Sequence, residues 1–174
     1  MRKVSGSNDL QIFIPKGMIE FCSKMAASPK SVGNPVCNHI PKSIDALASC
    51  RPGTGHDAFL SGIFVYFNWN INKIVREQLL RYNFINVISS QSLMHCFEKF
   101  KAEGLIDASV KTVDDVPLGF RYWISFCCNY RQLKTIYSQR KKHKRQEWQE
   151  FCKALELLPN SHWITCSSNH EGGV

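Results

Sequence analysis

A first group of residues able to bind or polarise a ligand lies between positions 78 and 95. Gln78 and Arg81 are three residues apart in a segment of helical periodicity, so they emerge on one side of a helix, one turn from each other. A glutamine amide can donate to and accept from a base edge, an arginine fork fits phosphate, and serine hydroxyls suit phosphate oxygens. The candidate binding residues of this group are Gln78, Arg81, Tyr82, Asn83, Ser92 and His95. A surface helix end followed by a polar loop is the alternative interpretation.

A second group lies between positions 129 and 146 and comprises Asn129, Arg131, Arg140 and Gln146. The two arginines are nine residues apart, or about 2.5 turns, so on a continuous helix they would emerge on opposite faces. Tyrosine and tryptophan residues alternate with the basic ones here. This combination suits stacking on a planar ring beside a phosphate. A solvated basic helix whose aromatic residues pack in the core is the alternative.

The positive charge of the chain is concentrated around this second group. The net charge is +8, and the stretch from Arg121 to Lys153 holds nine Lys and Arg residues against two Glu. An excess of this kind indicates an anionic partner, either a nucleotide or a nucleic acid contacted by the basic helix 131–145.

Several classes of protein are disfavoured. The chain contains no GxGxxG, GxxxxGK or HExxH motif. It has no GxSxG either, and no Cys lies in a known nucleophile context, so nucleophilic catalysis by Ser or Cys has no support. Eight Cys form no CxxC pair, and the combination of Cys37, His39, Cys50 and His56 matches no standard zinc spacing, so no metal site is expected. No export signal is evident, and the longest charge-free apolar run, 58–71, is too short to span a membrane. We expect reduced thiols, a cytoplasmic location and no membrane partner.

The elements that must position these residues indicate an α+β fold with an antiparallel or mixed sheet and long helices. With 174 residues and 44% hydrophobic content, the chain suits a single domain, 1–174, with disordered tails at 1–8 and 167–174. Alternation predicts strands over 10–14 and 64–69, and a shorter strand over 163–165. Helical periodicity predicts helices over 18–27, 43–50, 120–137 and 148–158, and one that starts at Asn72. A Ser-rich loop is expected over 86–92.

Taken together, the two groups resemble the flavin-dependent thymidylate synthase family. That family has a strand of the type Phe-x-Phe, then Gln-x-x-Arg-His-Arg on a helix, then Ser-x-Arg-Tyr. Here Phe64-x-Tyr66 through Gln78-x-x-Arg81 aligns with it without a gap. The family's second block is Asn-Leu-Arg-x-Leu, an Arg nine residues after the first, then Gln-x-Glu-Ile-Arg. The matching residues of this chain are Asn129, Arg131, Leu133, Arg140 and Gln146. The matching stretches are 56–95 and 118–158.

The chain departs from the family pattern at three places. Tyr82-Asn83 stands where the family has His-Arg, and Met94 stands where it has the Arg of Ser-x-Arg-Tyr. Trp148-Gln149-Glu150 replaces Glu-Ile-Arg. The chain also resembles short phage-encoded proteins that share the strings Gln-Leu-x-Arg-Tyr and Ser-Ser-Gln-Ser-x-Met-His.

The resemblance implies a homotetramer with FAD and a deoxyuridine nucleotide bound where subunits meet. In that family reduced flavin delivers hydride, methylenetetrahydrofolate supplies the carbon, and dUMP is methylated to dTMP without a protein nucleophile. Two interpretations follow for this chain. One is a flavin-dependent thymidylate synthase; the other is a non-catalytic relative that binds a nucleotide, or a nucleic acid through the basic helix.

Overall fold

The computed structural model of the protein describes residues 2–6, 8–26, 39–51 and 54–166. It is an α+β structure built on one five-stranded antiparallel sheet with the strand order β1-β2-β3-β5-β4. The strands are β1 (Arg2–Gly6), β2 (Leu10–Ile14), β3 (Phe64–Asn72), β4 (Asn86–Ser90) and β5 (Arg121–Asn129). The α+β class predicted from the sequence is confirmed.

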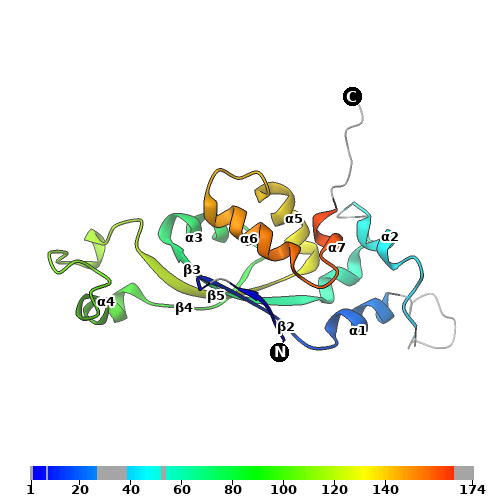
Figure 1. Cartoon of the computed structure of the whole chain (residues 1–174), viewed down its shortest axis with the longest axis horizontal. Helices are drawn as coiled ribbons and strands as arrows, with labels where there is room; N and C mark the ends of the chain where they lie inside the picture. The colour runs from blue at the N-terminus through cyan, green and yellow to red at the C-terminus, as the bar shows by residue number, and fades with distance from the viewer. Residues whose placement is uncertain (1, 7, 27–38, 52–53, 167–174) are drawn as a thin grey trace, which may run out of the picture.

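The helices lie mainly on one side of this sheet. They are α1 (Met18–Met25), α2 (Ile44–Ser49), α3 (Lys73–Leu80), α4 (Leu93–Ala102), α5 (Tyr130–Arg140), α6 (Gln146–Glu156) and α7 (His162–Thr165). Short 3-10 segments occupy Ala58–Gly62 and Val113–Asp115. Figure 1 shows α3, α5 and α6 over one face of the sheet, with α4 beyond one end and α1, α2 and α7 toward the other.

Strands β3 and β5 form the centre of the sheet and pair over their full nine-residue lengths, from Phe64 opposite Asn129 to Asn72 opposite Arg121. Both strands alternate buried and half-buried residues, which is the period of two expected when only one face is covered. Phe67 and Phe126 are buried beneath the helices and stack with ring centroids 4.8 Å apart. The face that carries Asn70 and Trp123 has no helix over its centre in the described part of the chain.

Several predicted elements agree with the structure. The strand at 10–14 has the predicted bounds, and the helices predicted at 43–50 and 148–158 correspond to α2 and α6. The predicted strand at 64–69 extends to Asn72. That residue caps α3, and its side chain accepts a hydrogen bond from the Val75 N–H at 3.0 Å. The helix predicted over 18–27 ends at Met25, and residue 27 lies outside the described residues.

The helix predicted over 120–137 is wrong in its first half. Residues Arg121–Asn129 form strand β5, and only Tyr130–Arg140 are helical. Apolar residues occur in this segment at both a helical and an alternating spacing. The ladder to β3 selects the alternating one, which buries Tyr122, Ile124 and Phe126 together. The basic helix expected over 131–145 therefore ends at Arg140, and the remaining lysines lie in the turn before α6.

Three shorter predictions are also corrected. The expected loop at 86–92 contains strand β4, which is exposed along its whole length and held by pairing with β5. The expected strand at 163–165 is part of helix α7, because Trp163 and Ile164 are both buried against the end of the core. Within the expected N-terminal tail, residues 2–6 form β1 on the edge of β2. The tail expected over 167–174 lies outside the described residues.

The described cysteines are all free thiols, and three of the seven (Cys22, Cys128 and Cys152) are buried. Burial raises the pKa of Cys152 to about 12, so this thiol stays protonated at neutral pH. Within the described ranges no group of three His, Cys, Asp or Glu side chains could hold a metal ion. Within the same ranges, no helix is long and apolar enough to cross a bilayer.

The alternation of β5 predicts that truncating two neighbouring residues lowers the free energy of unfolding by very different amounts. Phe126→Ala removes a fully buried ring from the core and is expected to lower the free energy of unfolding by about 3–5 kcal/mol. Cys127→Ala, on the other face, should lower it by less than about 1 kcal/mol. Urea denaturation measures both. A larger loss for Cys127→Ala than for Phe126→Ala would support the helical spacing and contradict the strand.

Candidate functional site

The two sequence groups meet at Trp148, which lies on α6 and is fully buried. Its indole N–H donates to the Gln78 Oε1 at 2.7 Å, which joins α6 to α3. The ring also packs edge-on against Trp69 of β3, with centroids 5.3 Å apart. Trp148 is not among the site residues that the sequence predicts, although it lies among the basic residues of the second group. Because its N–H is satisfied by Gln78, the indole is held in one orientation.

Arg140 lies over this indole at the end of α5. Its guanidinium carbon is 4.6 Å from the Trp148 ring centroid, within the range of a cation–π contact. Its Nε donates to the Tyr82 hydroxyl at 2.8 Å. Tyr82 is itself buried, just beyond the end of α3. The structure thus brings together Gln78, Tyr82 and Arg140, which are up to 62 positions apart in the chain. Together with Trp148, these three residues form what we call the α3–α5–α6 cluster.

The geometry of Arg140 suits the binding of an anion. Nε donates to the Tyr82 hydroxyl, and the guanidinium carbon lies over the Trp148 ring. The two terminal amino groups have no partner among the described residues, so the fork end is available to an acceptor pair. A planar fork of this kind binds a phosphate or a carboxylate with two parallel hydrogen bonds.

The turn between α5 and α6 lies beside the cluster. His143 packs edge-on to Trp148 at 6.3 Å, and its Nδ1 accepts from the backbone N–H of Arg145. Burial, with the positive charges of Arg140 and Arg145, lowers the pKa of His143 below its ordinary value. This histidine is therefore neutral at neutral pH and adds no charge to the cluster. Glu147 receives hydrogen bonds from Arg145 and Asn72, which neutralises one of the turn's cations.

Three further predicted residues lie near the cluster but outside its packed centre. Arg81 is the C-cap of α3 and is exposed, as is Asn83 two residues later. Neither side chain has a hydrogen-bond or ion-pair partner within the described residues. Gln146 begins α6 and donates to the Glu150 Oε1 at 2.7 Å, so both side chains are satisfied on the surface of their own helix. Arg81 and Asn83 remain available to a ligand, whereas Gln146 is engaged locally.

Asn129 and Arg131 lie at the opposite end of α5. Asn129 is the N-cap, and its side chain accepts from the Gln132 N–H while the Gln132 side chain accepts from the Asn129 N–H. This reciprocal capping box gives Asn129 a structural role. Arg131 forms an ion pair with the fully buried Asp57 at 3.0 Å. The distance between the Arg131 guanidinium and the Asp57 carboxylate is that of a salt bridge, but the two groups are not aligned for a hydrogen bond. Both Asp57 oxygens therefore lack a hydrogen-bond donor within the described residues. The sequence carried no signal for this partner.

Ser92 and His95 are placed apart from the other predicted residues. Ser92 caps α4 and accepts from the His95 backbone N–H at 3.3 Å, while the His95 side chain is exposed. Helix α4 packs on its own small apolar group, which includes Phe97 and Phe100, beyond the end of the sheet (Figure 1). Met94, in the position of the family arginine, is 77% exposed. The structure does not bring this group to the α3–α5–α6 cluster within one chain.

No family model matches the chain, and no curated protein matches it significantly. Solved structures do match. One is the flavin-dependent thymidylate synthase ThyX from Helicobacter pylori complexed with FAD and dUMP, at a TM-score of 0.61 and 14% identity over 88% of this chain and 96% of that one. A second ThyX structure from Helicobacter pylori, also with FAD and dUMP, gives a TM-score of 0.62 and 14% identity over 90% and 96%.

The fold is that of the flavin-dependent thymidylate synthases. The likeness spans nearly the full length of both chains, which confirms the fold that the motif resemblance implies. At 14% identity the comparison shows the fold alone, because one fold can carry different activities.

The hydrogen bond from Tyr82 to Arg140 predicts a measurable effect on stability. Tyr82→Phe keeps the ring but leaves a charged, half-buried donor without its acceptor, and is expected to lower the free energy of unfolding by about 1–3 kcal/mol. Tyr137→Phe is the matched control. It removes a hydroxyl that donates to Glu156 at an exposed position and should cost less than about 1 kcal/mol. Equal losses in the two variants by urea denaturation would show that Tyr82 does not hold Arg140.

Proposed function

We propose that this protein binds FAD and a deoxyuridine nucleotide in the manner of the flavin-dependent thymidylate synthases. The observation that carries the proposal is the α3–α5–α6 cluster, in which two distant motifs of one family meet on that family's fold. The donor set suits a phosphorylated, planar ligand, because it offers an arginine fork at Arg140, an exposed arginine at Arg81 and an amide at Asn83. A protein of this function would work in a cytoplasm, where thiols stay reduced.

Each residue of the cluster then has a distinct task. Trp148 and Tyr82 fix the plane of the Arg140 guanidinium, so that its fork meets the nucleotide without a further loss of side-chain freedom. Gln78 is held through its carbonyl oxygen and can offer its Nε2 to a base edge. Arg81 adds a second cation for the phosphate. Bound reduced flavin would supply hydride, with methylenetetrahydrofolate as the carbon donor, and dUMP would become dTMP.

A homotetramer is part of the proposal, because the remaining predicted site residues lie away from the α3–α5–α6 cluster of their own chain. Ser92 and His95 on α4, and Arg131 at the start of α5, would be completed by the α3–α5–α6 cluster of a neighbouring subunit. The sheet supports such an assembly. Its helix-free face carries the half-buried aromatic residues Phe13, Tyr66 and Trp123, and the edge strand β4 exposes Val87 and Ile88. Exposed apolar surface on a free sheet edge is typical of a protein interface.

The proposal predicts that the purified protein retains flavin. After incubation with FAD and desalting, the absorbance spectrum between 300 and 600 nm should keep the flavin bands, and tritium should be released from labelled dUMP when methylenetetrahydrofolate is added. Arg140→Ala should weaken dUMP binding by about tenfold or more, the effect of losing a charge-assisted pair. Lys142→Ala is the control, since this lysine is an exposed cation outside the packed cluster. A blank spectrum after desalting would refute flavin binding.

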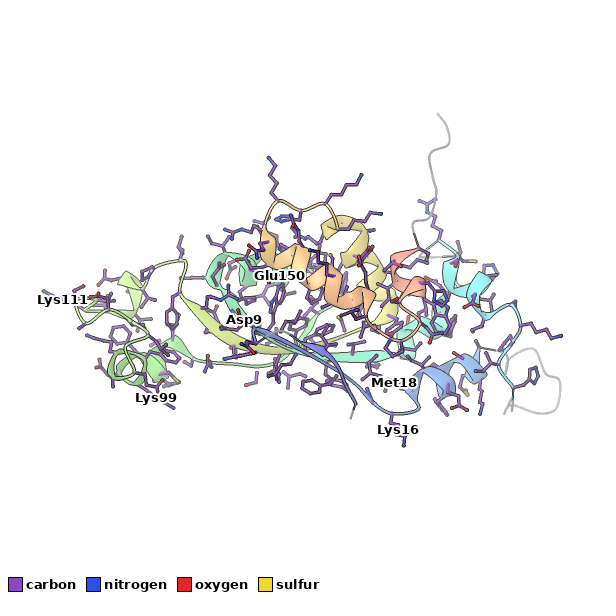
Figure 2. All side chains as sticks on the ribbon, viewed as in Figure 1. Asp9, Lys16, Met18, Lys99, Lys111 and Glu150 are labelled. Carbon is purple, nitrogen blue, oxygen red and sulfur yellow. The ribbon has the colours of Figure 1, made fainter. Side chains whose placement is uncertain are left out.

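A second candidate function is binding of a nucleic acid through the α5–α6 turn. Lys141, Lys142 and Lys144 are exposed there, and Figure 2 shows long side chains extending from this turn into open space. Clustered cations of this kind contact phosphates without reading sequence. This candidate makes the protein a non-catalytic relative of the enzyme family.

Charge reversal separates the two candidates. Lys141→Glu with Lys142→Glu should leave flavin retention intact if the nucleotide site is the α3–α5–α6 cluster. If the turn binds a nucleic acid, the same double variant should abolish binding of a single-stranded oligonucleotide, and wild-type affinity should fall steeply with salt. A wild-type affinity independent of salt would rule out the second candidate. Fluorescence anisotropy across a salt series measures it.

A further inference from the structure

The ion pair between Arg131 and Asp57 joins the start of helix α5 to the segment that precedes strand β3. Asp57 is fully buried, and the Arg131 Nη2 lies 3.0 Å from its Oδ1. In the described part of the chain, Arg131 is the only basic side chain that pairs with this carboxylate, and no hydrogen bond reaches either of its oxygens. A buried carboxylate is stable only beside a compensating charge. The charge of Arg131 is therefore needed to balance that of Asp57.

The backbone holds both partners of this pair in place. Arg131 is the second residue of α5, within the turn that the capping box fixes. Asp57 stands directly before the 3-10 segment Ala58–Gly62. The two sides are joined by the Tyr130 N–H, which donates to the Ile63 carbonyl at 3.0 Å. Arg131 cannot move to the phosphate of a ligand without leaving a buried carboxylate unpaired, which is strongly unfavourable.

The two arginines of α5, Arg131 and Arg140, thus differ in the charge that they offer to a ligand. Arg140 has no carboxylate partner within the described residues, and its neighbours are the Tyr82 hydroxyl and the Trp148 indole, both uncharged. Its positive charge is available to an anion. The Arg131 side chain is 30% exposed, and its guanidinium donates no hydrogen bond to another described residue. It therefore offers N–H donors whose positive charge is already balanced.

We propose that Asp57 is a positioning residue that limits Arg131 to an uncharged part of the ligand. The repulsion between Asp57 and a phosphate offsets the attraction of Arg131, so the pair gains little from an anion. A ring carbonyl oxygen accepts from a guanidinium N–H without bringing a charge. The phosphate is then left to Arg140 and Arg81. This inference rests on the function proposed above, because it divides that ligand between the two ends of α5.

A double-mutant cycle tests the charge balance without any ligand. Arg131→Gln leaves the Asp57 carboxylate buried and unpaired, and should lower the Tm by about 10 °C. Combining it with Asp57→Asn removes both charges and should recover at least half of that loss. Thermal unfolding followed by circular dichroism measures the two single variants and the double variant. If Arg131→Gln does not fold, folding of the double variant gives the same support. Losses that add independently would overturn the proposal.

The salt dependence of FAD binding tests the specificity. Asp57→Asn uncovers the charge of Arg131, so the affinity for FAD at low salt should rise by about threefold or more and should fall more steeply with added NaCl than in the wild type. Asp9→Asn is the matched control, because it breaks an ion pair with Arg121 at the opposite end of β5 and should leave the salt dependence unchanged.

The outcomes separate this inference from the function on which it rests. A purely structural role of Asp57 would weaken FAD binding at every salt concentration in Asp57→Asn and leave the salt dependence as in the wild type. That result would overturn the proposal. If the wild type binds no flavin, the proposed function fails, and the double-mutant cycle still decides whether Asp57 cancels the charge of Arg131.

Discussion

The pairing of β3 with β5 determines where helices α3 and α5 begin and where their ends meet. Each strand runs directly into a helix, and each helix begins at an asparagine cap, Asn72 for α3 and Asn129 for α5. Because the strands are antiparallel and fully in register, these two caps lie at opposite ends of the ladder. The helices pack on the same face, and their C-terminal ends meet at Tyr82 and Arg140. A shift of one residue would turn the buried side chains of either strand to the open face.

Of the residues that depart from the family motifs, Tyr82 is buried in the α3–α5–α6 cluster, whereas Glu150 and Met94 are exposed outside it. Tyr82 takes the place of a histidine and anchors Arg140 through its hydroxyl. Glu150 takes the place of an arginine, but it is exposed and bonded to Gln146 on its own helix, so its charge lies outside the packed centre of the cluster. Met94 is on α4, also outside the cluster. The packed centre is thus an arginine held by two aromatic rings, and the acid that replaces a family arginine is kept at the surface.

Local sequence patterns predicted the elements whose apolar residues follow a single periodicity. They failed where one segment carries both a helical and an alternating periodicity. β2 and α6 follow a single pattern, and Asn72 stands directly before a helical periodicity, which predicts the cap of α3. β5 carries both patterns, and only its long-range pairing with β3 decides between them. The cap at Asn129 could have been found from the Asn-x-x-Gln spacing of a capping box. The family resemblance selected Gln78 and Arg140 as binding residues, but their meeting at Trp148 and the pairing of Arg131 with Asp57 depend on tertiary packing that no local pattern encodes.

Hydrogen-exchange mass spectrometry, with and without FAD and dUMP, would show whether motifs separated along the chain form one nucleotide site on this fold. We expect slower exchange, when both ligands are present, in peptides that cover 78–83, 90–95 and 129–140, including the α4 segment that a neighbouring subunit would supply. Protection confined to the basic turn 141–145, or no protection in any of the three segments, would contradict it.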